Sequence, residues 1–548
     1  MTDEPNARER TGSDYILDAL VAEGVTELFG LIGEGNAALL DALHEHDLPF
    51  NQARHEQVAV MMADGYARVS GSVGVCTLTH GPGVTHGATG IACADRDNVP
   101  MVILIGDTNF EGRETSLQYL DHQTLTSPIT VYGTRIETPE TIPEILRRAF
   151  DKARMERGPV IVEIPGDIQS GPEPDRPYQP KRRNPQRPAP DRDRVEDAAG
   201  LLAAADRPAI VAGGGATASG AGDAIASLAE RIGAPIATTF YAKGILPESH
   251  PFVSGIAGTF MTPANHELLD SADVVLAIGT QLSGKATRFG AMYADATLIQ
   301  IDIDHGAMGT HLDPDLEIVA DARTAVEALL DVVDADQDRA ARVRSAIAEA
   351  DRPEDLPVET DPNRIDPRAL TVALADRLPD EITITVDSGN NTGFPPVFHR
   401  LEGDGRMLVN GNFGSMGYAL PAALGAQIAT PDRPVLCYIG DGAFMQVIQD
   451  LETAVRLALP IIIVVYNDES YGIIRHRQHL EFGRTTASEY ESPAFDEIAR
   501  GFGAEAAVVR SVDDLDVVDE FLAADIDRPL LLDARTMPGI SRPGFPPY

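Results

Sequence analysis

The sequence predicts an α/β protein made of three consecutive doubly wound domains, each with a parallel sheet. The chain of 548 residues is too long for one core, and domains of roughly 150–200 residues would number about three. Short apolar runs alternate with amphipathic segments throughout, which is typical of parallel strands covered by helices on both faces. Two stretches rich in proline and charge interrupt this alternation and indicate interdomain linkers.

The linkers place the expected domains at residues 10–172, 190–336 and 366–540. The first linker begins at Ser170 and reads SGPEPDRPYQPKRRNPQRPAPDRD; the second ends at Pro367 and reads EADRPEDLPVETDPNRIDP. The N-terminal segment before the first domain has no apolar stretch of the secretory type. We therefore expect a short solvated tail there and a cytoplasmic protein.

Three apolar runs in each domain are the clearest strand candidates. They are VGVCTLT (73–79), PMVILIGD (100–107) and GPVIVEIP (158–165) in the first domain, RPAIVAGGG (207–215), ADVVLAIG (272–279) and ATLIQIDID (296–304) in the second, and EITITVD (381–387), PVLCYIGD (434–441) and PIIIVVYND (460–468) in the third. Between the last two runs, Phe444, Ile448, Leu451 and Val455 recur at helical spacing. This order predicts a strand, a helix and a second, parallel strand.

The composition excludes some functions and indicates a habitat. The net charge is −40, from 84 acidic and 44 basic residues, which is the opposite sign from that of a nucleic-acid-binding protein. No apolar run approaches the roughly 20 residues of a membrane helix. Lysine occurs only at positions 152, 181, 243 and 285. An acid excess with so little lysine is typical of a halophilic protein from a salt-rich cytosol. Salt at 1 M shortens the range of repulsion between like charges to about 3 Å.

One short stretch carries the strongest chemical signal. Gly440, Asp441 and Gly442 follow an apolar run and precede the helical pattern, and open α/β sheets bind ligands at such strand ends. Glycines let a phosphate approach the backbone, but Asp441 would repel it unless a cation lay between them. Asn467 and Asp468 end the next strand candidate and offer further oxygen ligands. A purely structural turn is the alternative for Gly-Asp-Gly alone, but the two features together predict Mg²⁺ and a phosphate group.

These motifs resemble those of a known superfamily. The stretch GDGAFMQ…VVYNDESYG resembles the thiamine diphosphate motif of acetolactate synthases, pyruvate oxidases and benzoylformate decarboxylases. ARHEQVAVMMADGYARVSG with GPGVTHGATGIACADRDNVPMVILIGD is similar to the pyrimidine-binding domain, RPAIVAGGGATASGA…IATTFYAKGILPESHP to the central Rossmann-like domain, and GNFGSMGYALPAALGA to the start of the diphosphate domain's cofactor region. The resemblance covers nearly the whole chain in the family's order, and it is greatest to acetolactate synthase large subunits.

The resemblance assigns roles in the diphosphate-binding domain. It implies that Asp441, Asp468 and the backbone carbonyl of Ser470 bind Mg²⁺. Many relatives have asparagine where this chain has Asp468, so the effect of the added charge on cofactor affinity stays open. The cofactor-binding residues implied in this domain are Asn390, Gly414, Met416, Gly440, Gly442 and Ala443, of which Met416 would hold the cofactor bent and the Gly414 carbonyl would accept from its 4′-amino group.

The resemblance also assigns the catalytic residues of the pyrimidine-binding domain. Glu56 would hydrogen-bond the pyrimidine N1′ of a cofactor held by the other subunit, which implies a homodimer or homotetramer with active sites between subunits. Taken alone, Glu56 is a polar residue at a helix start, for which solvation is the default. His80 stands where acetolactate synthases usually have serine and benzoylformate decarboxylase has an active-site histidine, and Gln118 resembles the active-site glutamine of acetolactate synthases.

The sequence leaves three functions open. The first is decarboxylation of a 2-oxo acid to an enamine followed by carboligation, as in acetolactate synthases. The second is simple decarboxylation with release of an aldehyde, and the third is a non-catalytic relative that keeps the fold and the dimer. The chain has no tryptophan where biosynthetic acetolactate synthases carry a substrate-selecting one. At Gly213 a tight structural turn is expected; the family's central domain holds FAD, ADP or neither, and the sequence does not support FAD.

Overall fold

The computed structural model describes residues 9–181, 186–261, 263–350, 352–524 and 526–543. Most of the expected N-terminal tail and the last residues of the chain lie outside these ranges. Three six-stranded sheets follow one another along the chain, and all their strand pairs are parallel. The predicted α/β class with three parallel-sheet domains is therefore confirmed, while the exact domain boundaries stay a prediction.

The first domain has the strand order β2-β1-β3-β4-β6-β5. Its strands are β1 (Leu28–Gly30), β2 (Phe50–Gln52), β3 (Gly74–Thr79), β4 (Met101–Asp107), β5 (Tyr132–Arg135) and β6 (Pro159–Pro165). Its helices are α1 (Gly12–Ala22), α2 (Ala37–Asp41), α3 (Glu56–Ser70), α4 (Pro82–Arg96), α5 (His122–Thr126), α6 (Ile142–Glu156) and α7 (Gly166–Ser170). The central strands β3, β4 and β6 are buried along their whole length, as their continuous apolar runs predict.

The second domain has the order β12-β11-β10-β7-β8-β9, which is the strand order of a Rossmann fold. Its strands are β7 (Pro208–Ala212), β8 (Ile236–Thr238), β9 (Val253–Ile256), β10 (Val274–Ile278), β11 (Thr297–Asp302) and β12 (Leu316–Val319), and its helices are α8 (Arg192–Ala204), α9 (Gly214–Ser219), α10 (Gly222–Ile232), α11 (Pro263–Asp270), α12 (Ala322–Val332) and α13 (Gln337–Glu349). A Cβ atom on Gly213 would lie 2.4 Å from the Gly279 carbonyl oxygen, so close packing of two backbones explains this glycine turn.

The third domain repeats the topology of the first, in the order β14-β13-β15-β16-β18-β17. Its strands are β13 (Thr383–Val386), β14 (Arg406–Val409), β15 (Val435–Gly440), β16 (Ile462–Asn467), β17 (Glu505–Val509) and β18 (Leu530–Arg535). Its helices are α14 (Pro367–Arg377), α15 (Pro395–Phe398), α16 (Ala419–Ala429), α17 (Asp441–Val447), α18 (Leu451–Arg456), α19 (Gly472–Phe482), α20 (Phe495–Phe502) and α21 (Asp516–Ala523).

The helix predicted after Asp441 is not continuous. Helix α17 ends at Val447, where φ is −131°, and a 3₁₀ turn separates it from α18. The buried Asp450 in this turn accepts hydrogen bonds from the Arg54 backbone N–H (2.7 Å) and from the Thr453 hydroxyl (2.9 Å). These bonds tie the turn to the first domain, a tertiary contact that the helical spacing of apolar residues could not predict.

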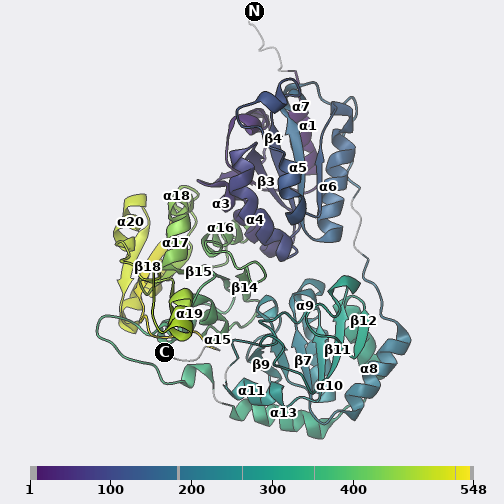
Figure 1. The fold of residues 1–548 in the computed structure, drawn as a ribbon, viewed down its shortest axis with the longest axis vertical. Helices are drawn as coiled ribbons and strands as arrows, with labels where there is room; N and C mark the ends of the chain where they lie inside the picture. Colours follow the sequence, from purple (N-terminus) through teal and green to yellow (C-terminus); the bar gives the residue numbers. More distant parts are fainter. Residues whose placement is uncertain (1–8, 182–185, 262, 351, 525, 544–548) are drawn as a thin grey trace, which may run out of the picture.

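Two helices join the first and third domains within one chain (Figure 1). Helix α3 packs along α16, and their apolar side chains belong to one continuous core. The approach is close because both helices carry glycines: a Cβ atom on Gly65 would lie 2.3 Å from the Ala422 oxygen, and one on Gly425 would lie 2.0 Å from the Met62 oxygen. Within the described ranges, no helix combines the length and the apolar character that crossing a membrane requires.

Candidate cofactor and metal site

The third sheet changes direction between β13 and β15. The chain leaves β13 toward β14 on one side, and β15 leads to β16 on the other. Such a switch point opens a crevice at the carboxyl ends of the strands, where open α/β sheets bind ligands. Three carboxylates follow these ends: Asp387 after β13, Asp441 after β15 and Asp468 after β16.

Asp441 is buried and held in a fixed orientation. Its Oδ1 accepts hydrogen bonds from the Gly442 N–H (2.8 Å) and the Tyr490 hydroxyl (3.0 Å), and its Oδ2 accepts from the Ser492 hydroxyl (3.1 Å). The Gly442 N–H, which the resemblance assigns to the diphosphate, thus donates to Asp441 in this structure. Burial raises the pKa of Asp441 to about 6, and these hydrogen bonds oppose that shift.

Asp468 lies across the crevice on the neighbouring strand. Burial, followed by the negative charge of Asp441, raises its pKa to about 8. Its Oδ1 accepts a hydrogen bond from the Ser470 N–H (3.2 Å), so the chain turns sharply at this point. Two partly desolvated carboxylates repel each other, and a divalent cation between them would offset both the repulsion and the burial.

The donor set fits magnesium. The carboxylates of Asp441 and Asp468 and the backbone carbonyl of Ser470 would supply only oxygen atoms. Mg²⁺ keeps further coordination positions for phosphate oxygens and water. Two positions around the site have no space for a side chain. A Cβ atom on Gly472 would lie 2.7 Å from Asp468 Oδ2, and one on Gly442 would lie 2.7 Å from the Tyr471 ring. The residues present therefore fit a cation that joins the protein to a diphosphate.

Asp387 is a site residue that the sequence analysis missed. It is fully buried, and its carboxylate accepts from the backbone N–H groups of Gly417 (3.0 Å) and Ala419 (2.8 Å). Burial raises the pKa of Asp387 to about 6, against the effect of these hydrogen bonds. Its signal in the sequence was an acid directly after a strand, the same signal that identified Asp441 and Asp468.

The loop held by Asp387 carries two of the expected cofactor residues. Gly414 has a φ of +74°, a conformation that favours glycine. Met416 is partly buried and packs against the core shared by the first and third domains. Asn390, after β13, donates to the Ile540 carbonyl (2.9 Å), so a segment near the chain's C-terminus lies over this end of the crevice.

The first domain gathers its expected catalytic residues around the start of α4. Glu56 begins α3 and is 9% exposed. His80 is 2% exposed, and a Cβ atom on Gly35 would lie 2.3 Å from its Nδ1. A Cβ atom on Gly81 would lie 2.3 Å from the Gln118 carbonyl oxygen, so His80 and Gln118 are neighbours across this glycine.

A buried charged cluster supports the His80 loop and was not predicted. The Gly81 N–H donates to His122 Nε2 (2.9 Å), so this nitrogen carries no proton. Burial lowers the pKa of His122 to about 4 and raises that of Glu163 to about 7. Arg135 pairs with both Glu163 and Asp107, so opposite charges in the cluster compensate one another. The bond from the Gly81 N–H to His122 attaches the His80 loop to this cluster.

The two sets of residues lie on different domains. Among the described residues, no hydrogen bond or ion pair links Glu56, His80 or Gln118 to the Asp441–Asp468 crevice. This separation is what an active site shared between subunits requires, but the chain alone does not test that expectation. The assignment of individual site residues therefore remains a prediction.

Comparison with protein families agrees with the order of the three sheets. The thiamine pyrophosphate enzyme N-terminal TPP binding domain matches residues 10–126. The thiamine pyrophosphate enzyme central domain matches residues 195–329. The thiamine pyrophosphate enzyme C-terminal TPP binding domain matches residues 387–534, the range that contains the Asp387–Asp441–Asp468 crevice.

Several curated proteins are similar over almost their whole length. The probable acetolactate synthase large subunit of Methanocaldococcus jannaschii is 34% identical, over 98% of this chain and 93% of that protein. Acetolactate synthase isozyme 3 large subunit of Escherichia coli K12 is 31% identical, over 90% of this chain and 88% of that protein. Sulfoacetaldehyde acetyltransferase of Castellaniella defragrans is 32% identical, over 93% of this chain and 90% of that protein.

Proposed function

The chain belongs to the family of thiamine-pyrophosphate-dependent enzymes, and from that premise we propose that it decarboxylates a 2-oxo acid and joins the remaining acyl unit to a second carbonyl compound. Its relatives support acetolactate-synthase-like function. The observation that carries the proposal is the pair Asp441 and Asp468 on neighbouring strand ends of the domain that matches the C-terminal TPP binding family.

The chain's own residues would bind the cofactor in the third domain. Asp441, Asp468 and the Ser470 carbonyl would hold Mg²⁺, and the backbone of Gly440, Gly442 and Ala443 would bind the diphosphate. The Gly442 N–H, which donates to Asp441 in this structure, would be available to the diphosphate. Thiamine diphosphate, when bound, supplies the electron sink for loss of CO₂.

The remaining residues orient the cofactor and manage protons. Met416 would support the cofactor from the core side; the Gly414 carbonyl lies in the same loop, after β14, and Asn390 lies in the loop after β13. Glu56 would share a proton with the pyrimidine ring, a task for a positioned carboxyl group. His80 and Gln118, neighbours across Gly81, would lie on the substrate side.

A substrate screen tests the reaction. The protein is incubated in molar KCl with thiamine diphosphate, Mg²⁺ and pyruvate, and the products are identified by NMR. Acetolactate as the product supports carboligation, whereas acetaldehyde alone supports simple decarboxylation. Simple decarboxylation is the second candidate function because position 80 is a histidine. Sulfoacetaldehyde belongs in the screen because a relative's name specifies it. No turnover of any 2-oxo acid by protein that binds the cofactor would contradict the proposal.

We also propose that the active site forms between two subunits. The test mixes a Glu56→Gln variant with an Asp441→Ala variant under conditions that exchange subunits. In a mixed dimer one site carries both defects and the other carries neither, so random mixing should restore about a quarter of wild-type turnover. If each site lay within one chain, the mixture would stay inactive.

A further inference from the structure

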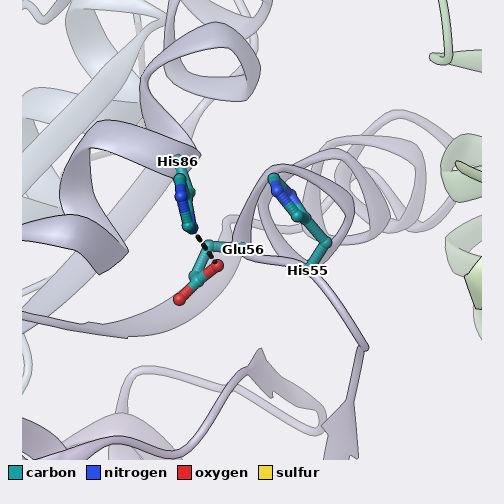
Figure 2. A group of neighbouring side chains, drawn as sticks. All are labelled: His55, Glu56 and His86. Atoms are coloured by element: carbon teal, nitrogen blue, oxygen red, sulfur yellow. Dashed lines mark hydrogen bonds and ion pairs between the residues drawn. The ribbon is translucent and has the colours of Figure 1, made fainter. Parts of the chain in front are cut away.

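Glu56 has a partner that the proposed function does not use. His86 Nδ1 lies 3.0 Å from Glu56 Oε2, and Figure 2 shows the imidazole edge directed at the carboxylate. Glu56 comes from the first residue of α3, and His86 from the second turn of α4. An ionised carboxylate can only accept, and with Glu56 in that form His86 Nδ1–H is the donor of this hydrogen bond.

The surroundings hold the imidazole in place while leaving it accessible. His55 stacks on His86 with 4.9 Å between ring centroids and 25° between ring planes, as Figure 2 also shows. The His86 side chain is 53% exposed, whereas that of Glu56 is 11% exposed. His86 therefore extends from a buried carboxyl group to the surface of the single chain.

The neighbouring titratable groups do not compete for this bond. His55 Nδ1 accepts from the Gln57 N–H (3.2 Å), and burial lowers the pKa of His55, with Glu56 opposing the shift. Cys76 lies near Glu56, and burial raises the pKa of its thiol well above the ordinary value. Among the described residues, His86 is therefore the imidazole that pairs with the Glu56 carboxylate.

The two carboxylate oxygens face different neighbours. His86 occupies Oε2, whereas a Cβ atom on Gly83 would lie 3.6 Å from Oε1. The missing side chain of Gly83 leaves space beside Oε1, while Oε2 is already bonded. One oxygen can thus be held by the protein while the other stays free for a ligand.

We propose that His86 is the positioning residue of Glu56. The Nδ1–H group fixes Oε2 and leaves Oε1 free, so that Oε1 would be available to the pyrimidine of the cofactor. This inference rests on the proposed function only for the role of Glu56; the hydrogen bond itself belongs to the cofactor-free protein.

The first experiment therefore needs no cofactor. ¹⁵N NMR of the imidazole groups, at about pH 8.5 where histidine is neutral, identifies which ring nitrogen carries the proton. We assign the His86 signal by its loss in His86→Asn. The expected result is a proton on Nδ1 in the wild type, and loss of this preference in Glu56→Ala. An Nε2–H form in the wild type, or no change in Glu56→Ala, would overturn the pairing.

The second experiment measures H/D exchange at C2 of the bound cofactor. His86→Leu removes the donor and should slow exchange about tenfold, since a hydrogen bond to a charged group is lost. His86→Asn offers an N–H at nearly the same place and should retain most of the rate. His44→Leu, at an exposed histidine of the same domain, is the matched control.

The outcomes separate this inference from the proposed function. A wild-type protein that binds no thiamine diphosphate refutes the proposed function, while the NMR experiment still tests the pair. Normal exchange in both His86→Leu and His86→Asn refutes the role of His86 alone. Equal slowing of exchange in His86→Leu and His86→Asn would mean that His86 supports only the fold and would also overturn the proposal.

Discussion

Asp441 and Asp468 end the neighbouring parallel strands β15 and β16, and the charge of Asp441 adds to burial in raising the pKa of Asp468 to about 8. Two carboxylates held this way create a site that a divalent cation stabilises. We expect Asp441→Ala to abolish Mg²⁺-dependent binding of thiamine diphosphate while leaving the protein folded. Calorimetry with and without Mg²⁺ measures the loss.

A surface substitution in the same domain controls for that experiment. Asp432 is exposed in the loop before β15, so Asp432→Ala removes one negative charge without touching the crevice and should bind the cofactor normally. Unchanged cofactor affinity in Asp441→Ala would show that the metal is held elsewhere.

Asp387 determines the shape of the loop that carries Met416. In Asp387→Asn an amide nitrogen would face one or more of the backbone N–H groups that now donate to the carboxylate, those of Ser388, Gly417 and Ala419. Leaving a buried N–H without an acceptor should cost about 1–3 kcal/mol of stability, and cofactor affinity should fall as the loop loosens. Urea unfolding and calorimetry test both effects, with Asp404→Asn at an exposed position as control. Wild-type values for both quantities in Asp387→Asn would contradict this role.

The sequence predicted those features that depend on short segments. Continuous apolar runs identified the buried strands, and an acid after a strand identified Asp441 and Asp468. The break between α17 and α18 was not predicted because it depends on Asp450 reaching Arg54 in another domain. His86 was missed for the same reason, since 30 residues separate it from Glu56 and only the packing of α3 on α4 brings them together.

Glu56 should govern activation of the cofactor and not its binding. In Glu56→Gln the side chain keeps its shape and can still hydrogen-bond, but it cannot share a proton with the pyrimidine. General acid–base help of this kind contributes on the order of 10²–10⁴-fold, so C2 exchange and turnover should slow together by that factor. Quenched-flow NMR measures the exchange, and calorimetry checks that affinity is retained. Near-wild-type exchange would mean that another residue, such as the adjacent His55, activates the cofactor.

His399 should make the third domain sensitive to acid. It is buried beside the Tyr438 hydroxyl (2.8 Å), and burial lowers its pKa from 6.5 to about 3. The unfolded chain therefore binds a proton that the folded protein does not, so stability is full above about pH 6.5 and falls as the pH drops toward 3. At pH 5 the loss from this group should be about 2 kcal/mol.

The variant His399→Asn isolates this contribution. Asparagine can still pair with the Tyr438 hydroxyl but does not titrate, so its stability loss between pH 7 and pH 5 should be smaller than that of the wild type. Glu163, whose pKa is raised to about 7 by burial, acts in the opposite direction in both proteins and cancels in the difference. Equal losses from urea unfolding of both proteins would refute the prediction, and His44→Asn should behave as the wild type.

Salt should stabilise the protein because its charge is unbalanced. With 84 acidic and 44 basic residues, at least 40 acidic side chains would lack a basic partner even if every basic residue were paired. Molar KCl weakens exposed ion pairs such as Arg192–Glu196, but such pairs contribute only about 0–1 kcal/mol each. Screening of the excess negative charge acts over the whole surface, so the net effect should be stabilising.

The thermal midpoint should therefore rise as KCl increases from low to molar concentration. For domains of this size each kcal/mol gained raises the midpoint by about 2–4 °C, so a change of several degrees is expected. Sucrose at matched osmolality controls for effects other than charge screening, and it should raise the midpoint less. A midpoint that is flat or falls between low and molar KCl would refute the halophilic interpretation of the composition.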